Sequence, residues 1–169
     1  TLYNDTTEYS ATVVGTDAET DLAVIKIDKT GLPAAELGDS DTVKVGEFSM
    51  AIGNPLGMQS SVTGGLISAL NREVTESDGK TYKLIQTDAA INSGNSGGAL
   101  FDKKGHLVGI TNAGISSGDN IGYAIKSSYL INLIDSAPIN ISLPKGGNLT
   151  GKDLPAIIKL YSPYIAIIK

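Results

Sequence analysis

One serine between glycines is the part of this chain best suited to chemistry. The segment Gly94–Gly98 reads GNSGG, and its glycines allow a tight turn that a substrate carbonyl can approach closely. The backbone amides of Gly94 and Ser96 can then point at one spot and stabilise a developing oxyanion. A serine nucleophile also needs a base to take its proton. The chain has a single histidine, His106, which follows Ser96 by only ten positions.

Two arrangements of a catalytic serine can be compared with this order. GNSGG also matches G-x-S-x-G, the nucleophile elbow, which needs a strand before the serine and a helix after it. Here a predicted strand, Ala99–Asp102, follows the serine and leads into a hairpin turn at Asp102–Gly105. The elbow also needs an acid and then a histidine downstream, whereas His106 lies just across this hairpin. The context excludes the elbow and favours the arrangement in which the acid precedes the serine.

Short strands at intervals of roughly ten residues are expected to position these groups. Glycine makes up 20 of the 169 residues, about 12% against a typical 7% or so, and with short β-branched runs this favours an all-β fold. Only Ser127–Ile134 has helical spacing, with Leu130, Ile131, Leu133 and Ile134 on one apolar face. The predicted strands are Tyr9–Gly15, Leu22–Ile27, Thr42–Val45, Glu47–Ile52, Ser60–Leu70, Tyr82–Thr87, Ala99–Asp102, Leu107–Thr111 and Gly122–Ile125.

Charge and composition argue against several classes of protein. The net charge is −5 and the pI is about 4.7, whereas nucleic-acid-binding proteins usually carry a basic face. Without cysteine the chain has no disulfide framework and no thiolate metal site. No apolar run reaches about 18 residues, so we expect no membrane span. We also expect no metal and no cofactor.

Seven motifs follow one another between residues 8 and 134. They are TDLAVIKI at Thr20–Ile27, AIGNPLG at Ala51–Gly57, TGGLISALNR at Thr63–Arg72, QTDAAIN at Gln86–Asn92, GNSGGAL at Gly94–Leu100, GITNA at Gly109–Ala113 and IGYAI at Ile121–Ile125. In their order and spacing the chain resembles the HtrA (Deg) family of trypsin-like serine proteases. The resemblance implies an all-β, trypsin-like double β-barrel with its first barrel incomplete, followed by a C-terminal helix and a short tail.

The resemblance also implies the catalytic roles. Ser96 corresponds to the nucleophile, and Asp21 corresponds to the acid that orients the histidine. The amides of Gly94 and Ser96 correspond to the oxyanion hole. The family's histidine lies upstream of the aspartate, at a point that falls before Thr1, so we expect it outside this chain. His106 is predicted to be an exposed hairpin residue.

A substrate pocket is implied in the same way. Ala90, six positions before Ser96, corresponds to the pocket floor, and an apolar floor favours small aliphatic P1 side chains over arginine or lysine. Asp88 is predicted to be a structural hydrogen-bonding group rather than a charge that selects substrates. The expected pocket walls contain Asn112, Ala113, Gly114 and Tyr123, which would also pair with the substrate backbone.

The chain is predicted to divide into three parts. Gly53–Gly57 breaks the strand pattern and is interpreted as the main linker. We expect residues 1–50 to be the remnant of a first β-barrel and residues 51–136 to be a second barrel with the following helix. Residues 137–169 form a tail of unknown role, not a PDZ domain. The tail is either a short element packed on the body or a segment that binds a partner or a membrane surface.

Two functions remain open at this point. The first is a serine endopeptidase domain that hydrolyses peptide bonds in unfolded or misfolded proteins through an acyl-enzyme. The alternative is a non-catalytic pseudoprotease that keeps the peptide groove for binding. Under both we expect the chain alone to be nearly inactive. The resemblance further implies polypeptide substrates, a possible homo-oligomer such as a trimer, and an extracytoplasmic location (periplasmic, cell-surface or secreted).

Overall fold

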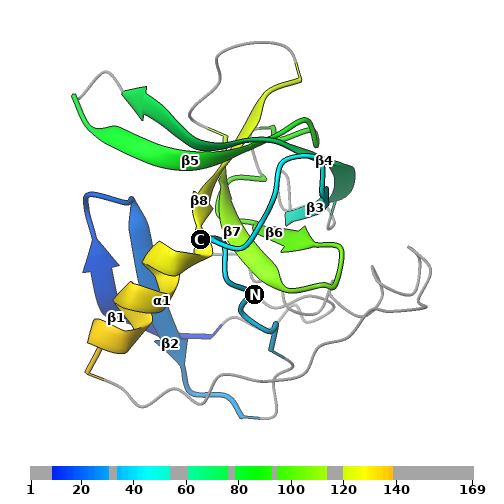
Figure 1. The fold of residues 1–169 in the computed structure, drawn as a ribbon. Coiled ribbons are helices and arrows are strands. Elements are labelled where there is room, and N and C mark those ends of the chain that lie inside the picture. Colours follow the sequence, from blue (N-terminus) through cyan, green and yellow to red (C-terminus); the bar gives the residue numbers. More distant parts are fainter. Residues whose placement is uncertain are drawn as a thin grey trace.

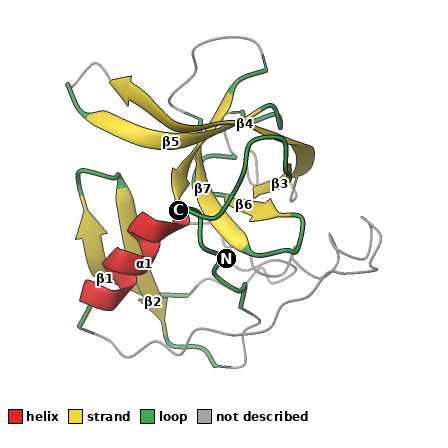
Figure 2. Ribbon diagram, in the orientation of Figure 1, coloured by secondary structure: helices red, strands yellow, loops and turns green. Residues whose placement is uncertain are grey.

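The computed structural model describes residues 9–30, 34–53, 61–75, 79–92, 95–113 and 120–138 (Figures 1 and 2). Within these ranges the chain forms eight strands and one helix, which confirms an all-β fold followed by a helix. The tail from residue 139 onward lies outside the described residues. The elements are β1 (Ala11–Asp17), β2 (Leu22–Ile27), β3 (Phe48–Gly53), β4 (Ser61–Thr75), β5 (Thr81–Thr87), β6 (Ala99–Asp102), β7 (Leu107–Asn112), β8 (Gly122–Lys126) and α1 (Ser127–Ser136).

Six strands close into one antiparallel barrel in the order β3-β4-β5-β8-β7-β6 (Figure 1). Because side chains alternate between the two faces of a strand, every second residue can point into the barrel. One buried residue from each strand contributes to the interior cluster: Ala51, Ile67, Ile85, Leu100, Val108 and Ala124. Burying each of the larger side chains contributes about 1.5–3 kcal/mol. This core fixes the strand ends from which the candidate site is built.

β1 and β2 form a separate two-stranded sheet, and α1 lies across it (Figure 1). Leu22 on β2 and Leu133 on α1 are each 8% exposed and share one cluster with Tyr82 and Leu84 of β5. Gly15 on β1 lies beside the helix, where a side-chain carbon would be in ordinary contact with Leu133 Cδ1, at 3.4 Å. Among the described residues β1 pairs only with β2. This two-stranded sheet is formed by the part of the chain for which the sequence predicts an incomplete first barrel.

The strand predicted at Thr42–Val45 is absent from the described structure, and this prediction is wrong. The Thr42 amide donates to the Asp39 carbonyl at 3.2 Å, which closes a turn. Gly46 then adopts a φ of 87°, a left-handed conformation that glycine enters without strain. Val43 is buried in the barrel core all the same. Val43 therefore packs from a turn instead of a strand, whereas Val45 is 60% exposed.

Of the segment interpreted as the main linker, Gly53 is the last residue of β3, and residues 54–57 lie outside the described residues. The strands before and after it, β3 and β4, pair side by side in the same barrel. The boundary expected after residue 50 falls inside β3. The division of the chain into a first-barrel part and a second-barrel part stays a prediction.

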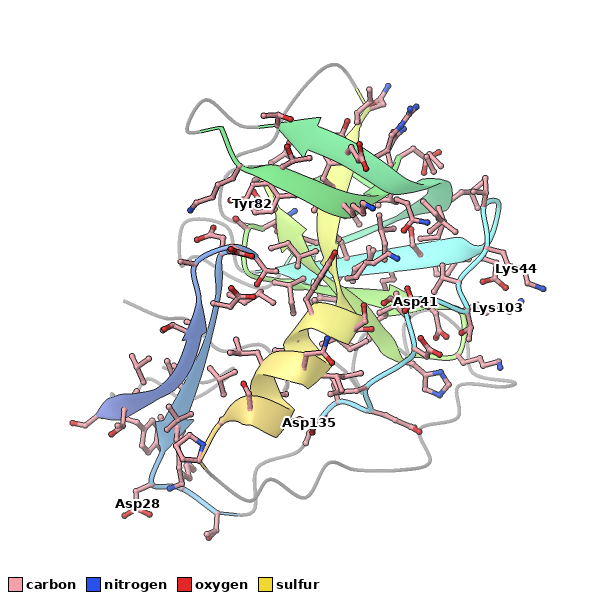
Figure 3. The ribbon with its side chains drawn as sticks, turned by 60° about the vertical axis from the view of Figure 1, so that its left-hand side comes forward. Asp28, Asp41, Lys44, Tyr82, Lys103 and Asp135 are labelled. Atoms are coloured by element: carbon pink, nitrogen blue, oxygen red, sulfur yellow. The ribbon has the colours of Figure 1, made fainter. Side chains whose placement is uncertain are left out.

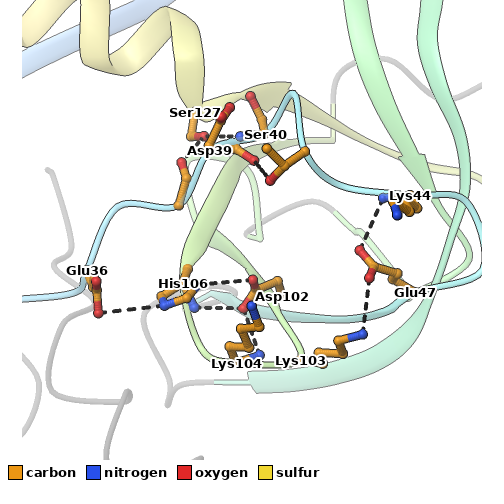
Figure 4. A network of polar contacts seen from close by, with 12 residues as sticks. Glu36, Asp39, Ser40, Lys44, Glu47, Asp102, Lys103, Lys104, His106 and Ser127 are labelled. Atoms are coloured by element: carbon orange, nitrogen blue, oxygen red, sulfur yellow. Dashed lines mark hydrogen bonds and ion pairs between the residues drawn. The ribbon is translucent and has the colours of Figure 1, made fainter. Parts of the chain in front are cut away.

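Glu47 stabilises the turn that leads into β3 through its carboxylate (Figure 4). Its carboxylate accepts the Lys44 amide at 3.1 Å and the Lys103 ammonium at 3.1 Å. The bond from the Lys44 amide, and secondly that from Lys103, lower the pKa of Glu47 below its ordinary value. Since the folded pKa is depressed, this stabilisation is present above the unfolded pKa and is lost as the pH falls through the folded one.

We therefore expect Lys103→Met to raise the pKa of Glu47 while leaving it below the ordinary value, because the larger contribution from Lys44 remains. An NMR titration of the Glu47 carboxyl measures this. Lys83→Met is the matched control, since Lys83 pairs with Glu73 at 3.6 Å on β4 and β5. A Glu47 that titrates at its ordinary value in the unaltered protein would contradict the prediction.

Candidate active site

The turn Asn95–Gly98 lies directly before β6 and exposes Ser96 to solvent. Gly97 has a φ of 78°, which a residue with a side chain adopts only with strain. Gly98 passes so close to β3 that a side-chain carbon there would lie 2.5 Å from the Ile52 carbonyl oxygen. Both glycines are thus required by the path of the backbone, Gly97 by its φ and Gly98 by the closeness of β3.

Thr111 on β7 holds this turn from two sides. Thr111 is buried, with 2% of its surface exposed. Its hydroxyl donates to the Asn95 carbonyl, and the Gly98 carbonyl is a second acceptor at 3.2 Å. Its backbone amide donates to the Gly98 carbonyl at 2.9 Å, and its carbonyl accepts the Gly97 amide at 2.8 Å. From the sequence Thr111 is assigned no role. Its position could have indicated one, because it precedes the predicted wall residue Asn112 in the same strand, and neighbours in a strand face opposite sides.

The predicted nucleophile and one predicted wall residue lie together. The Ala113 amide, one residue past the end of β7, donates to Ser96 Oγ at 3.4 Å. Asn112 and Tyr123 are register partners across β7 and β8, and they are 8% and 5% exposed. Two of the predicted wall residues therefore lie on paired strands of the barrel, and the third, Ala113, follows β7 directly and contacts Ser96.

Ala90, the predicted pocket floor, is exposed, and its backbone carbonyl accepts two side-chain hydrogen bonds. That oxygen accepts the Thr63 hydroxyl at 2.9 Å and the Asn95 side-chain amide at 3.3 Å. Asn95 thus joins the proposed floor to the serine turn. The predicted oxyanion-hole residue Gly94 and the predicted wall residue Gly114 lie outside the described residues.

Asp88 has the structural role predicted for it. One of its carboxylate oxygens accepts the Leu66 amide at 2.6 Å, and its own amide donates to the Leu66 carbonyl at 3.3 Å. Gly65 makes this approach possible, because a side-chain carbon there would lie 2.2 Å from Asp88 Oδ1 and 2.3 Å from the Ala89 nitrogen. The strand β4 therefore fixes the residues that lead to Ala90.

Asp21 lies at the end of the β1–β2 turn, exposed and with a φ of 56°. Asp17 closes this turn by accepting the Thr20 hydroxyl at 2.7 Å and the Glu19 amide at 3.0 Å, and these bonds lower the pKa of Asp17. No hydrogen bond or ion pair joins Asp21 to Ser96, both of which the structure describes. In a Ser-His-Asp arrangement the histidine lies between the two, so the roles of Asp21 and Ser96 stay predictions.

His106 lies at the other end of β6 from Ser96, roughly 10 Å or more away by the rise of a strand. Its ring is 24% exposed, with Nδ1 3.1 Å from Asp102 and Nε2 3.7 Å from Glu36 (Figure 4). The hairpin position predicted for His106 is confirmed. The residue is only partly exposed, however, because the segment with Glu36 packs alongside β7. There the Leu107 amide donates to the Glu36 carbonyl at 2.8 Å.

A cavity of about 200 Å³ lies between the β1–β2 turn, β5, β8 and α1. Figure 3 labels Tyr82 there, on β5 beside the turn. The lining residues are Glu19, Thr20, Thr81, Tyr82, Lys83, Leu84, Ile125 and Tyr129. They include the residue before Asp21 but none of the predicted pocket residues, so this cavity is separate from the predicted pocket.

Within the described ranges, no group of three or more histidine, aspartate and glutamate side chains is arranged to hold a metal ion. No helix in those ranges has both the length and the apolar character needed to cross a membrane.

The sequence is similar to a known family and to known proteins. The family model described as "Trypsin-like peptidase domain" matches residues 2–110. A probable periplasmic serine protease, do/HhoA-like, from Haemophilus influenzae is 47% identical over 135 residues, which cover 77% of this chain and 29% of that protein. A probable periplasmic serine endoprotease, DegP-like, from Chlamydia pneumoniae is 46% identical over 136 residues, 78% of this chain and 28% of that protein. The chain thus spans under a third of each of these two relatives.

A solved structure is similar as well. The structure described as the HtrA-type protease AlgW with decapeptide superposes with a TM-score of 0.68 at 48% sequence identity. The match covers 76% of this chain and 40% of that chain.

Proposed function

The chain belongs to the trypsin-like peptidase domain family and is HtrA-like within it, and from this premise we propose that it is a serine endopeptidase domain. The observation that carries the proposal is the exposed Ser96 on a turn whose flanking residues are all bound to Thr111. A serine that only closed a turn would need neither exposure nor two obligatory glycines beside it. The proposed substrates are unfolded or misfolded proteins.

The proposed chemistry is acyl transfer. Ser96 Oγ attacks the peptide carbonyl and gives its proton to a base, and the amides of Gly94 and Ser96 stabilise the oxyanion. The C–N bond then breaks, and the base returns the proton to the leaving amine. Water attacks the acyl-enzyme in the same way and releases the acid. In this scheme Asp21 orients and stabilises the protonated base.

We propose that the base is a histidine outside these 169 residues. Support comes from His106, whose two ring nitrogens lie beside Asp102 and Glu36 at the far end of β6. An imidazole held there is out of hydrogen-bond reach of Ser96, and a general base must lie within that reach.

The proposed specificity is for small aliphatic P1 side chains. Ala90 places no charge at the proposed floor, so a substrate lysine or arginine would lose its hydration without a partner. The carboxylate of Asp88 is already bound to the Leu66 amide. We assign the walls to Asn112, Ala113, Gly114 and Tyr123, as the sequence predicts.

Location and assembly are proposals too. The relatives named as periplasmic support an extracytoplasmic location. Phe48 and Leu66, register partners on β3 and β4, are 37% and 46% exposed and support a homo-oligomer that covers them. Sedimentation of the full-length protein tests this, and a monomer at all concentrations would exclude it.

The position of His106 also favours a second candidate, a pseudoprotease that binds peptides without cleaving them. Hydrolysis of an unfolded protein by the full-length protein separates the two. We expect Ser96→Ala to lower kcat by about 10⁶-fold, the loss measured when subtilisin loses its serine, while peptide affinity is kept. Ser68→Ala, an exposed serine on β4, is the control and should leave kcat unchanged. Saturable peptide binding with no hydrolysis in the unaltered protein would establish the pseudoprotease.

A further inference from the structure

We infer that Thr111 is a positioning residue for Ser96, an inference that rests on the proposed function. Its buried hydroxyl binds the carbonyl of Asn95, the residue before the serine. Its backbone binds Gly97 and Gly98, the two residues after the serine. A turn made of small residues has few side chains to pack against, so hydrogen bonds to the neighbours of Ser96 decide where Oγ lies.

Thr111 also relates the nucleophile to the proposed pocket. Asn112 and Ala113 follow it directly, and the Ala113 amide donates to Ser96 Oγ at 3.4 Å. β7 is paired on both sides, with β6 and with β8, where Thr111 faces Ala124. The strand is therefore the fixed part and the turn is the part that can shift. A turn released from Thr111 would move Oγ relative to the wall that holds the substrate backbone.

The hydroxyl is the part of Thr111 that substitution can remove, since its backbone bonds persist. Thr111→Val keeps the shape and loses the donor, whereas Thr111→Ser keeps the donor. Ser127→Ala is the matched control for losing a buried hydroxyl. Ser127 is 0% exposed at the start of α1, where its hydroxyl donates to the Gly38 carbonyl at 2.7 Å and accepts the Ser40 amide at 3.2 Å.

The first readout is the rate constant for phosphonylation of Ser96 by a fluorophosphonate in the full-length protein, measured beside peptide affinity. We expect Thr111→Val to slow phosphonylation at least about tenfold, because a misplacement of 1 Å can cost about 100-fold. Peptide affinity stays unchanged, Thr111→Ser restores the rate, and Ser127→Ala keeps it. A Thr111→Val protein labelled at the normal rate overturns the inference. So does an equal slowing by Ser127→Ala, which would indicate general destabilisation.

The second readout is hydrogen exchange at the Gly98 amide, which donates to the same Asn95 carbonyl at 2.9 Å. This measurement does not depend on catalysis. If the unaltered protein shows no labelling at Ser96, the proposed function fails, and Gly98 exchange alone decides the role of Thr111. Faster exchange in Thr111→Val, but not in Thr111→Ser or Ser127→Ala, supports the inference. Equal exchange in all four proteins contradicts it.

Discussion

The 169-residue chain by itself is expected to hydrolyse peptides about 10⁶-fold more slowly than the full-length protein, the loss seen when subtilisin is deprived of its histidine. The physical reason is the place of His106. Its ring lies between Asp102 and Glu36 at the β6–β7 hairpin, whereas Ser96 precedes β6. Without a base the serine hydroxyl stays protonated, and only oxyanion stabilisation and binding remain to assist the reaction.

His106→Gln is the control for this expectation. We expect it to leave the residual hydrolysis by the chain unchanged, because the ring takes no part in the reaction. The rates are measured with an unfolded protein substrate at equal concentrations of the chain and of the full-length protein. Fast hydrolysis by the chain that disappears in Ser96→Ala would contradict the account, and its loss in His106→Gln would identify His106 as the base.

Gly65→Ala is expected to lower the free energy of unfolding by about 3 kcal/mol, at the upper end for a single overpacked position. The added carbon would lie 2.2 Å from Asp88 Oδ1 and 2.3 Å from the Ala89 nitrogen. The second of these is a backbone atom, so no side-chain rotation relieves the clash. The segment leading to Ala90 must move, and we expect peptide affinity to fall with stability.

Gly64→Ala, one residue earlier on β4, is the matched control. The added carbon there would meet only the Phe48 ring, at 3.4 and 3.5 Å, which is ordinary contact. We expect its unfolding free energy to stay within about 1 kcal/mol of that of the unaltered protein. Urea unfolding measures both variants. Equal losses in Gly64→Ala and Gly65→Ala would show that the crowding at Asp88 does not matter.

The parts of the fold predicted best are those governed by local pattern. β2 at Leu22–Ile27 and β6 at Ala99–Asp102 match the sequence prediction residue for residue, because each is an apolar run between turn residues. β4 was predicted to end at Leu70 but continues to Thr75. It passes through Asn71, whose φ is 53°, beside a register shift against β5. Alternation breaks at such a shift, so a pattern of period 2 cannot follow the strand past it.

What the sequence missed depends on contacts between distant segments. Glu36 lies 70 positions before His106 and is brought beside it only by its backbone contact with Leu107 at the start of β7. No residue near His106 in the sequence indicates this contact. The hydrogen bond from the Thr111 hydroxyl to the Asn95 carbonyl likewise joins residues 16 positions apart. The motif order predicts a set of site residues, which stays a prediction, whereas the hydrogen bonds around Ser96 become visible only in the folded barrel.

Fluorophosphonate labelling of the protein in its source cells, followed by mapping of the adduct, shows whether Ser96 is a nucleophile. We expect one adduct, on the peptide that contains Ser96. We also expect a labelled polypeptide heavier than the 17.5 kDa of these 169 residues, because the proposed base comes from outside them. A folded protein in which Ser96 stays unlabelled, while other serine hydrolases in the same cells react, would contradict the claim that Ser96 is a nucleophile.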